Sequence, residues 1–203
     1  VFPPYAYRYQ TLDESLNSIV GLENVKRKMK ELEKYILYKN KTQSLGVKLP
    51  PTNLHMIFNG NPGTGKTAMA RIMTKMLYDI GAIKENKLIE VERKDLIAKY
   101  VGQTAALTSE VINKAMDGVL FIDEAYSLTP KSDNDYGHEA ISTLIKAMED
   151  HKDKFVVIFA GYEEEMRQFV NTNPGIASRI GYTFDFEDYS AEELLKSSGF
   201  PYE

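Results

Sequence analysis

The sequence predicts an α/β fold with a parallel sheet that is covered by helices on both faces. Short apolar runs alternate along the chain with longer segments of helical periodicity. A glycine-rich turn follows the first apolar run, and a later run ends in two carboxylates. Such alternation needs crossover connections, which make neighbouring strands parallel. The length of 203 residues suits one domain.

The first half of the chain is predicted to hold two helices and two strands. Apolar residues at helical spacing predict an amphipathic helix over residues 22–36. Glycine and a proline pair predict a surface loop over residues 40–53. The dense apolar run 54–58 is typical of a buried parallel strand. Helical periodicity resumes over residues 68–77, and a second short strand fits residues 88–91.

The second half continues the same alternation. Helices are predicted over residues 104–116 and 138–150. Strands are predicted over residues 119–122, 155–159 and 182–186. We therefore expect five parallel strands, and the sequence shows no internal repeat.

Charge and composition narrow the classes of partner. The chain has 25 Lys and Arg against 29 Asp and Glu, a net charge of -4, so it lacks the basic footprint of a nucleic-acid-binding domain. A protein partner is favoured over nucleic acid. The absence of cysteine excludes disulfides and thiolate sites, and fits an intracellular compartment. No stretch approaches the roughly 18 apolar residues of a membrane span, so we expect a cytoplasmic protein with no membrane partner.

A phosphate-binding loop is the strongest motif in the chain. The pattern G-x-x-x-x-G-K-[ST] is matched at every fixed position by Gly60-Asn61-Pro62-Gly63-Thr64-Gly65-Lys66-Thr67, with Ala68 following. Glycines let successive N–H groups converge on phosphate oxygens at the start of a helix. Lys66 is expected to reach the β and γ phosphates, and Thr67 to offer its hydroxyl to Mg²⁺. The alternative is that this segment is a plain glycine-rich turn between a strand and a helix. The strand predicted before it and the helix predicted after it match the context that the motif requires.

Two carboxylates complete the predicted chemistry. Asp123 and Glu124 follow the apolar run 119–122, and ligands bind at the carboxyl edge of open α/β sheets. Asp123 is suited to hold Mg²⁺, and Glu124 to orient and deprotonate the attacking water. A solvated Asp-Glu pair is the ordinary interpretation of such a dipeptide alone. The phosphate loop earlier in the chain favours the catalytic one, with ATP and Mg²⁺ as ligands.

These motifs together resemble the AAA+ ATPases. The resemblance is carried by the phosphate loop, by Asp123-Glu124, and by Asn173-Pro174-Gly175 followed by Ser178-Arg179. Segments 118–128 and 159–162 resemble the subgroup that contains the red-type Rubisco activase and stage V sporulation protein K. The similarity runs from about Leu16 to Leu195.

The resemblance implies a P-loop NTPase sheet in the order 5-1-4-3-2 and a nucleotide held between subunits of a ring, usually a hexamer. It also implies that Arg179 is an arginine finger that stabilises charge on the phosphoryl group in a neighbour's site. The alternative for Arg179 is an ordinary surface charge. Val20 and Gly21 match the segment that packs against adenine. Packing in the protein core explains these residues equally well.

A candidate substrate loop follows the second predicted strand. Lys99, Tyr100 and Val101 lie where AAA+ motors carry an aromatic pore loop. An exposed tyrosine offers a large rigid surface that can grip an extended peptide without regard to its sequence. Tyr100 is alternatively a buried anchor for its own loop.

The chain departs from the AAA+ pattern in two places. Where a polar residue commonly ends the fourth strand and helps to position the attacking water, the sequence has Ala160-Gly161-Tyr162. Either Tyr162 or another polar group takes this role, or the subgroup dispenses with it. We divide the chain into an N-terminal extension (1–15), a nucleotide-binding domain (16–189) and a truncated start of the helical lid (190–203). Because a lid closes over adenine, a chain of this length is expected to bind nucleotide more weakly and to assemble less well.

The function predicted from these features is an ATP-driven motor that remodels a protein substrate in a ring. The alternative is an ATP-dependent scaffold or switch that assembles and recruits partners without threading. DNA translocation also occurs on this fold, but the acidic charge balance argues against it.

Overall fold

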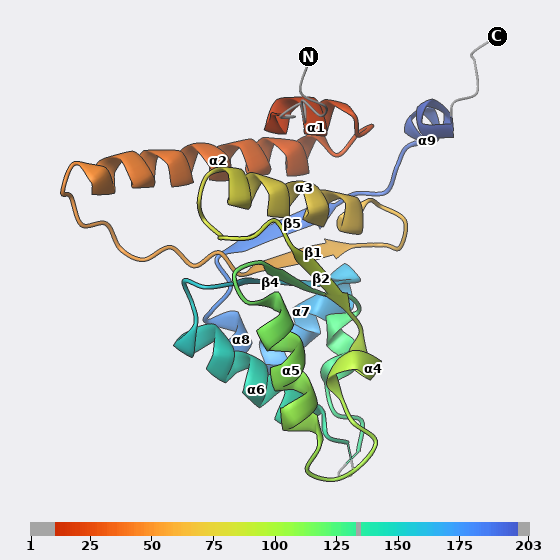
Figure 1. Cartoon of the computed structure of the whole chain (residues 1–203). Coiled ribbons are helices and arrows are strands. Elements are labelled where there is room, and N and C mark those ends of the chain that lie inside the picture. Colours follow the sequence, from red (N-terminus) through yellow and green to blue (C-terminus); the bar gives the residue numbers. More distant parts are fainter. Residues whose placement is uncertain (1–10, 133–134, 199–203) are drawn as a thin grey trace, which may run out of the picture.

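Five parallel strands form one sheet at the centre of the computed structural model, which describes residues 11–132 and 135–198 (Figure 1). The strands are β1 (Met56–Gly60), β2 (Leu88–Val91), β3 (Val119–Ile122), β4 (Val156–Gly161) and β5 (Tyr182–Phe186). Their spatial order is β2-β3-β4-β1-β5, and every pair is parallel. The predicted fold class and the order 5-1-4-3-2 are therefore confirmed.

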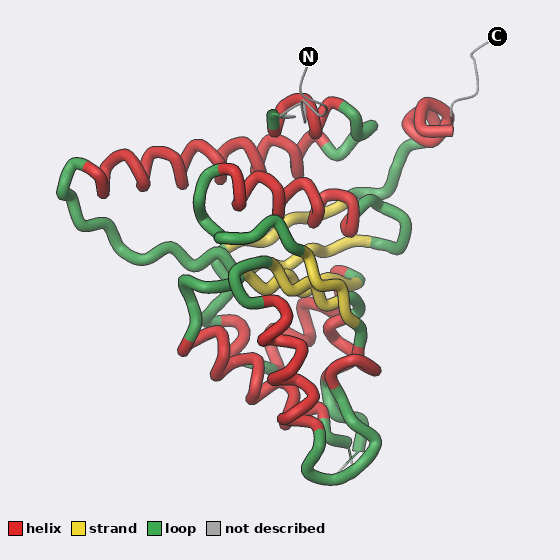
Figure 2. Tube along the Cα trace, viewed as in Figure 1, coloured by secondary structure: helices red, strands yellow, loops and turns green. Residues whose placement is uncertain are grey.

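Helices cover both faces of this sheet. They are α1 (Leu12–Asn17), α2 (Glu23–Ser44), α3 (Lys66–Asp79), α4 (Arg93–Leu96), α5 (Thr104–Ala115), α6 (Gly137–Asp150), α7 (Glu163–Thr172), α8 (Pro174–Ala177) and α9 (Ala191–Ser198), with a 3-10 turn η1 (Ala125–Leu128). The first three lie on one face, and α5 to α8 lie on the other (Figure 2). In the described part of the chain, no helix combines the length and apolar character needed to span a membrane.

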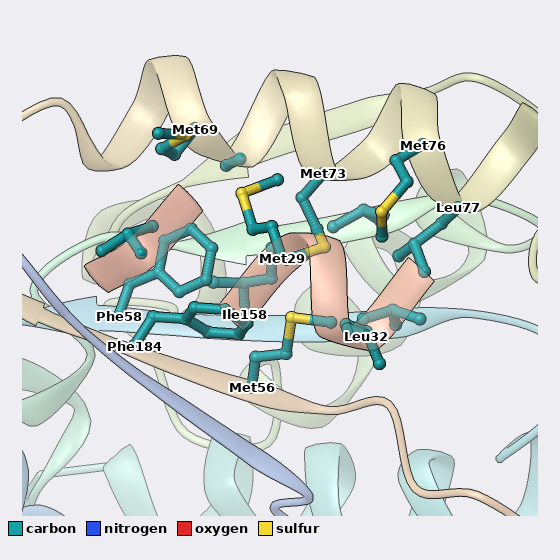
Figure 3. Packing of buried hydrophobic residues seen from close by; sticks show 14 of the residues in the cluster. Met29, Leu32, Met56, Phe58, Met69, Met73, Met76, Leu77, Ile158 and Phe184 are labelled. Carbon is teal, nitrogen blue, oxygen red and sulfur yellow. The ribbon is translucent and has the colours of Figure 1, made fainter. Parts of the chain in front are cut away.

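The core between the sheet and the first three helices is rich in methionine (Figure 3). It includes Met29 and Leu32 of α2, Met69, Met73, Met76 and Leu77 of α3, and Met56, Phe58, Ile158 and Phe184 of the strands. Flexible thioether side chains fill irregular gaps where long helices cross a twisted sheet. This packing fixes α3, and with it the loop that precedes α3, against β1.

The central strands are buried on both faces. In β3, Val119 and Phe121 pack toward α2 and α3, whereas Leu120 and Ile122 pack toward α5 and α6. All four residues of β3 and all six of β4 are buried. Continuous apolar runs are expected from strands covered on both sides, and they deliver rigid carboxyl ends to one edge of the sheet.

One predicted boundary is wrong because a helix runs further than its apolar stripe. Helix α2 continues to Ser44, so the first five residues of the predicted loop 40–53 are helical. Asn40 is fixed by donating from its amide to the Ile80 carbonyl at 3.0 Å. No breaker precedes Gly46, whose φ of 84° is left-handed, and helices commonly end beside such a glycine.

Two strands also extend beyond their apolar runs. Strand β1 starts at Met56 and ends at Gly60, and β4 ends at Gly161. Their last residues are held by pairing with neighbours, as Asn59 pairs with Gly161 and Gly60 with Phe186. Backbone pairing does not depend on apolar side chains. The ends predicted from apolar residues alone were therefore wrong for these two strands. The phosphate loop is consequently attached directly to a paired strand.

Candidate active site

A cleft of about 370 Å³ opens where β1, β3 and β4 end. It is lined by Gly60, Pro62, Gly63, Gly65, Lys66, Thr67, Ala68, Asp123, Glu124, Gly161 and Tyr162. Most of the predicted phosphate loop and both predicted carboxylates therefore meet around one space. Parallel strands place these segments together although they are far apart in the sequence.

Glycines allow the phosphate loop to leave β1 tightly. At Gly60, an added Cβ would lie 2.7 Å from the Phe186 carbonyl oxygen of β5. Gly63 and Gly65 have φ values of 74° and 92°, a left-handed conformation that glycine adopts without steric cost. These conformations turn the loop back toward the start of α3.

Polar contacts hold the loop in this shape. The buried hydroxyl of Thr64 donates to the Asn61 carbonyl at 2.7 Å. The side-chain amide of Asn61 donates to the Asp188 carboxylate at 2.9 Å, which ties the loop to the segment after β5. Asn61 and Thr64 thus support the loop from outside the cleft lining, whereas their neighbours line it.

Lys66 is the first residue of α3 and places a cation over the loop. Its ammonium group donates to the carbonyl oxygens of Gly60 at 2.6 Å and Asn61 at 2.7 Å. Burial lowers the pKa of Lys66, and the negative charge of Asp123 acts in the opposite direction. Backbone N–H groups at the start of α3 add the positive end of the helix. The arrangement suits a polyphosphate.

Asp123 and Glu124 are positioned by the end of β3. The Asp123 N–H donates to the Val91 carbonyl of β2 at 2.9 Å, and the Glu124 N–H donates to the Asp123 carboxylate at 2.9 Å. Glu124 has a φ of 48°, which is uncommon for a residue other than glycine. Residues in such conformations cluster at functional sites.

The donor atoms of the cleft fit a magnesium ion. The Thr67 hydroxyl and the Asp123 carboxylate line the same space, and Mg²⁺ prefers oxygen ligands that it shares with phosphates and water. No sulfur or imidazole competes among the residues that line the cleft.

Comparison with known proteins shows the family to which this cleft belongs. The sequence profile of the "ATPase family associated with various cellular activities (AAA)" matches residues 56–186, which span both halves of the cleft. The chain belongs to the AAA family. The AAA domain is also 43% identical over 185 residues to stage V sporulation protein K of Bacillus subtilis, covering 91% of this chain and 58% of that protein.

Other relatives belong to the subgroup that the sequence resembles. The chain is 46% identical over 187 residues to the chloroplastic ribulose bisphosphate carboxylase/oxygenase activase of Cyanidioschyzon merolae, covering 92% of this chain and 64% of that protein. It is 44% identical to protein CbbX of Cereibacter sphaeroides, covering 94% and 62%. It thus spans less than two thirds of the length of these relatives.

A solved structure supports the fold. The crystal structure of the FIGL-1 AAA domain in complex with ADP superimposes with a TM-score of 0.61 at 20% sequence identity, covering 87% of this chain and 56% of that one. At this identity the likeness concerns the fold alone.

Val20 and Gly21 do not line the phosphate cleft of the AAA domain. An added Cβ at Gly65 would lie 3.4 Å from the Leu22 side chain, so the segment after Gly21 touches the loop. A smaller cavity of about 130 Å³, lined in part by Leu22 and Tyr189, lies there. Neither Val20 nor Gly21 lines this cavity, and five of its nine lining residues are acidic.

Arg179 lies at the other end of the sheet. It precedes β5, and the Gly181 N–H between them donates to the carbonyl of His55, which precedes β1. The five residues of β1, about 16 Å of strand, separate this end from the phosphate loop. The guanidinium donates to the Gly175 carbonyl at 2.8 Å and to Glu149 at 3.1 Å.

The candidate substrate loop is exposed. Tyr100 is 69% and Val101 79% accessible to solvent, and Lys99 is exposed as well. The alternative of a buried anchor is therefore wrong for Tyr100. The loop connects α4 to α5 at the lower end of the molecule in Figure 1, away from the helices that cover the opposite face.

Tyr162, a candidate from the sequence to replace the missing polar residue after the fourth strand, lines the phosphate cleft. It directly follows β4 and lines the cleft beside Gly161. Its ring centroid lies 6.1 Å from that of Tyr126, and an added Cβ at Gly161 would meet the Tyr126 ring at 2.8 Å. The missing polar residue at the end of β4 is the signal that pointed to this position.

Proposed function

We propose that this AAA domain binds ATP with Mg²⁺ and hydrolyses it. One observation carries the proposal: Lys66 and Thr67 from the loop after β1 and Asp123 and Glu124 from the end of β3 line one cleft. Thr67 and Asp123 would hold Mg²⁺, which when bound supplies positive charge to the β and γ phosphates.

The residues of the chain divide the chemistry between them. The ammonium group of Lys66 neutralises oxygens of the terminal phosphate, and N–H groups of the loop orient them. Glu124 accepts a proton from a water molecule whose oxygen attacks the terminal phosphorus. The bond between that phosphorus and the bridging oxygen breaks, and its electron pair leaves with ADP. Val20 and Gly21 would pack against adenine.

We further propose that the site is completed by a neighbouring subunit in a ring, as a hexamer. The position of Arg179 favours this, because an arginine at the far end of the sheet is remote from the cleft of its own chain. In a ring, its guanidinium would exchange the contact with Glu149 for the phosphoryl charge in an adjacent cleft. Residues 16–189 would form the nucleotide-binding domain, and residues 190–203 would belong to a lid. Residues 1–10 of the expected extension and 199–203 of the expected lid lie outside the described residues.

The proposed substrate is a protein rather than nucleic acid or membrane. The exposed ring of Tyr100 beside Val101 offers apolar contact to an extended chain, and the net charge of -4 disfavours nucleic acid. One relative is named as the activase of another enzyme, ribulose bisphosphate carboxylase/oxygenase, which also favours a protein substrate.

The test combines ATP turnover with polypeptide binding. Wild type should hydrolyse ATP, and Glu124→Gln should bind ATP while losing roughly a hundredfold or more in turnover. Fluorescent casein, an unfolded probe, should bind the ATP-loaded Glu124→Gln chain, and Tyr100→Ala should weaken that binding. Tyr38→Ala is the matched control, since Tyr38 is 63% exposed on α2. Turnover without any casein binding would favour the scaffold alternative.

A further inference from the structure

Asp123 and Glu124 also line a second cleft, and none of its lining residues belongs to the phosphate loop. This cleft of about 350 Å³ is lined by Glu92, Arg93, Lys94, Ile97, Asp123, Glu124 and Ser127. None of the first four belongs to the phosphate cleft. Arg93, the first residue of α4, therefore lies on a wall shared with both carboxylates.

Arg93 connects two segments that follow the carboxylates in sequence. Its guanidinium donates to the backbone carbonyl of Ser127 and, at 2.6 Å, to the carboxylate of Asp135. The Asp135 side chain is only 8% exposed. It accepts further hydrogen bonds from the N–H groups of Gly137 at 2.9 Å and Lys131 at 3.0 Å.

Asp135 remains charged in this environment. Burial acts to raise its pKa, but the hydrogen bonds from the Lys131 and Gly137 backbones and from Arg93 outweigh this effect, so the pKa lies below its ordinary value. A partly buried, charge-assisted pair of this kind has a more sharply defined geometry than an exposed one. Asp135 thus fixes the direction in which the Arg93 guanidinium points.

The other partner of Arg93 belongs to the turn that holds Glu124. Ser127 lies in η1, and its N–H donates to the Glu124 carbonyl at 2.8 Å. Glu124 itself has the left-handed φ of 48°, a conformation that persists only when its surroundings hold it. The hydrogen bond from Arg93 to the Ser127 carbonyl is one such constraint on the turn. It comes from α4, the segment that follows β2.

We propose that Arg93, held by Asp135, is a positioning residue that fixes the η1 turn so that the Glu124 carboxylate stays aligned for hydrolysis. The inference rests on the proposed ATPase function. Because α4 leads directly into the loop that carries Tyr100, the same side chain joins that loop to the catalytic carboxylate.

The test separates positioning from nucleotide binding and from folding. Arg93→Gln and Asp135→Asn should each lower kcat at least about tenfold, since small misplacements of catalytic groups are costly. KM for ATP and Tm should stay near those of wild type, and the double variant should be no worse than either single one. Arg93→Lys, which keeps the charge without the forked geometry, should recover only part of kcat.

Arg71→Gln is the matched control. Arg71 pairs with Glu90 at 2.9 Å on an exposed surface outside both clefts, so its kcat should change less than about twofold. Wild-type kcat in Arg93→Gln would overturn the inference and leave the proposed function intact. A fall in Tm that accompanies the fall in kcat in both variants would also overturn the inference, because it would show that Arg93 and Asp135 only stabilise the fold. Absence of turnover in wild type would overturn the proposed function, and the inference with it.

Discussion

The guanidinium of Arg179 is held 3.1 Å from the carboxylate of Glu149, at the end of the sheet remote from the phosphate loop. The Glu149 side chain is 62% exposed and that of Arg179 25% exposed. A residue so placed cannot serve the cleft of its own chain without large rearrangement. The Arg179 side chain is partly exposed at the surface, so it is accessible to an adjacent subunit.

Arg179→Ala is therefore expected to lower ATP turnover by roughly a thousandfold, the scale of an arginine finger. ATP affinity, measured with a fluorescent nucleotide, should change little, because the phosphate loop is untouched. Glu149→Gln is the control: it removes a mostly exposed ion pair, so the free energy of unfolding should change by less than about 1 kcal/mol. If Arg179→Ala turned over normally, Arg179 would be the surface charge of the alternative interpretation.

Tyr162 is expected to contribute a hydrogen bond in the phosphate cleft. Tyr162→Phe keeps the ring and removes only the hydroxyl, so kcat should fall about tenfold, the worth of one hydrogen bond, with KM for ATP unchanged. Tyr126→Phe is the matched control, because Tyr126 packs near Tyr162 but does not line the cleft. Equal kcat in both variants would assign no role to the Tyr162 hydroxyl.

Gly60→Ala should destabilise the domain more than Gly63→Ala. The new methyl group at Gly60 would meet the Phe186 carbonyl at 2.7 Å, and such overpacking costs about 1 to 3 kcal/mol. At Gly63 an added Cβ meets nothing within 4 Å, so only the left-handed conformation is penalised, by about 1 kcal/mol. Urea unfolding measures both variants. A smaller loss at Gly60 would show that β5 yields easily beside the loop.

His55 should make the stability of the domain depend on pH. Burial lowers its pKa to about 4, and the positive charge of Arg179 adds to this. Its Nδ1 accepts the Val157 N–H at 2.9 Å. The unfolded chain takes up a proton near pH 6.5, whereas the folded chain does so only near pH 4. The contribution of His55 to stability is therefore lost as the pH falls through this window.

Between pH 7 and pH 5 this linkage amounts to about 2 kcal/mol. Urea unfolding of wild type and His55→Gln at both pH values isolates it, because the many carboxylates affect both chains alike. Wild type should lose about 2 kcal/mol more than the variant. Parallel losses would mean that His55 is protonated, or solvated, in the folded state.

The sequence was sufficient for the features that depend on local pattern. Short apolar runs located β1, β3 and β4 to within two residues, and apolar residues interrupted by polar ones located β2 and β5. The spacing of glycines, Lys66 and Thr67 placed the phosphate loop. The meeting of this loop with Asp123 and Glu124 followed from parallel topology. The order of the strands came from family resemblance, because periodicity does not specify which strands pair.

Features that depend on tertiary contact were not predictable. The end of α2 at Ser44 and the last residues of β1 and β4 are set by pairing and breakers rather than by apolar spacing. Arg93 has no motif of its own, and its relation to Glu124 arises only when α4 and η1 come together. The same holds for Asn61 and Asp188, which are 127 residues apart.

The measurement that tests the central claim most directly is ATP hydrolysis by mixed subunits. Glu124→Gln and Arg179→Ala chains are each assayed alone and then mixed in equal amounts with Mg²⁺ and ATP. If one subunit supplies Glu124 and its neighbour Arg179, each variant alone is inactive, and mixing restores turnover at junctions where both intact residues meet. An inactive mixture, beside a wild-type chain that hydrolyses ATP, would contradict a site shared between subunits.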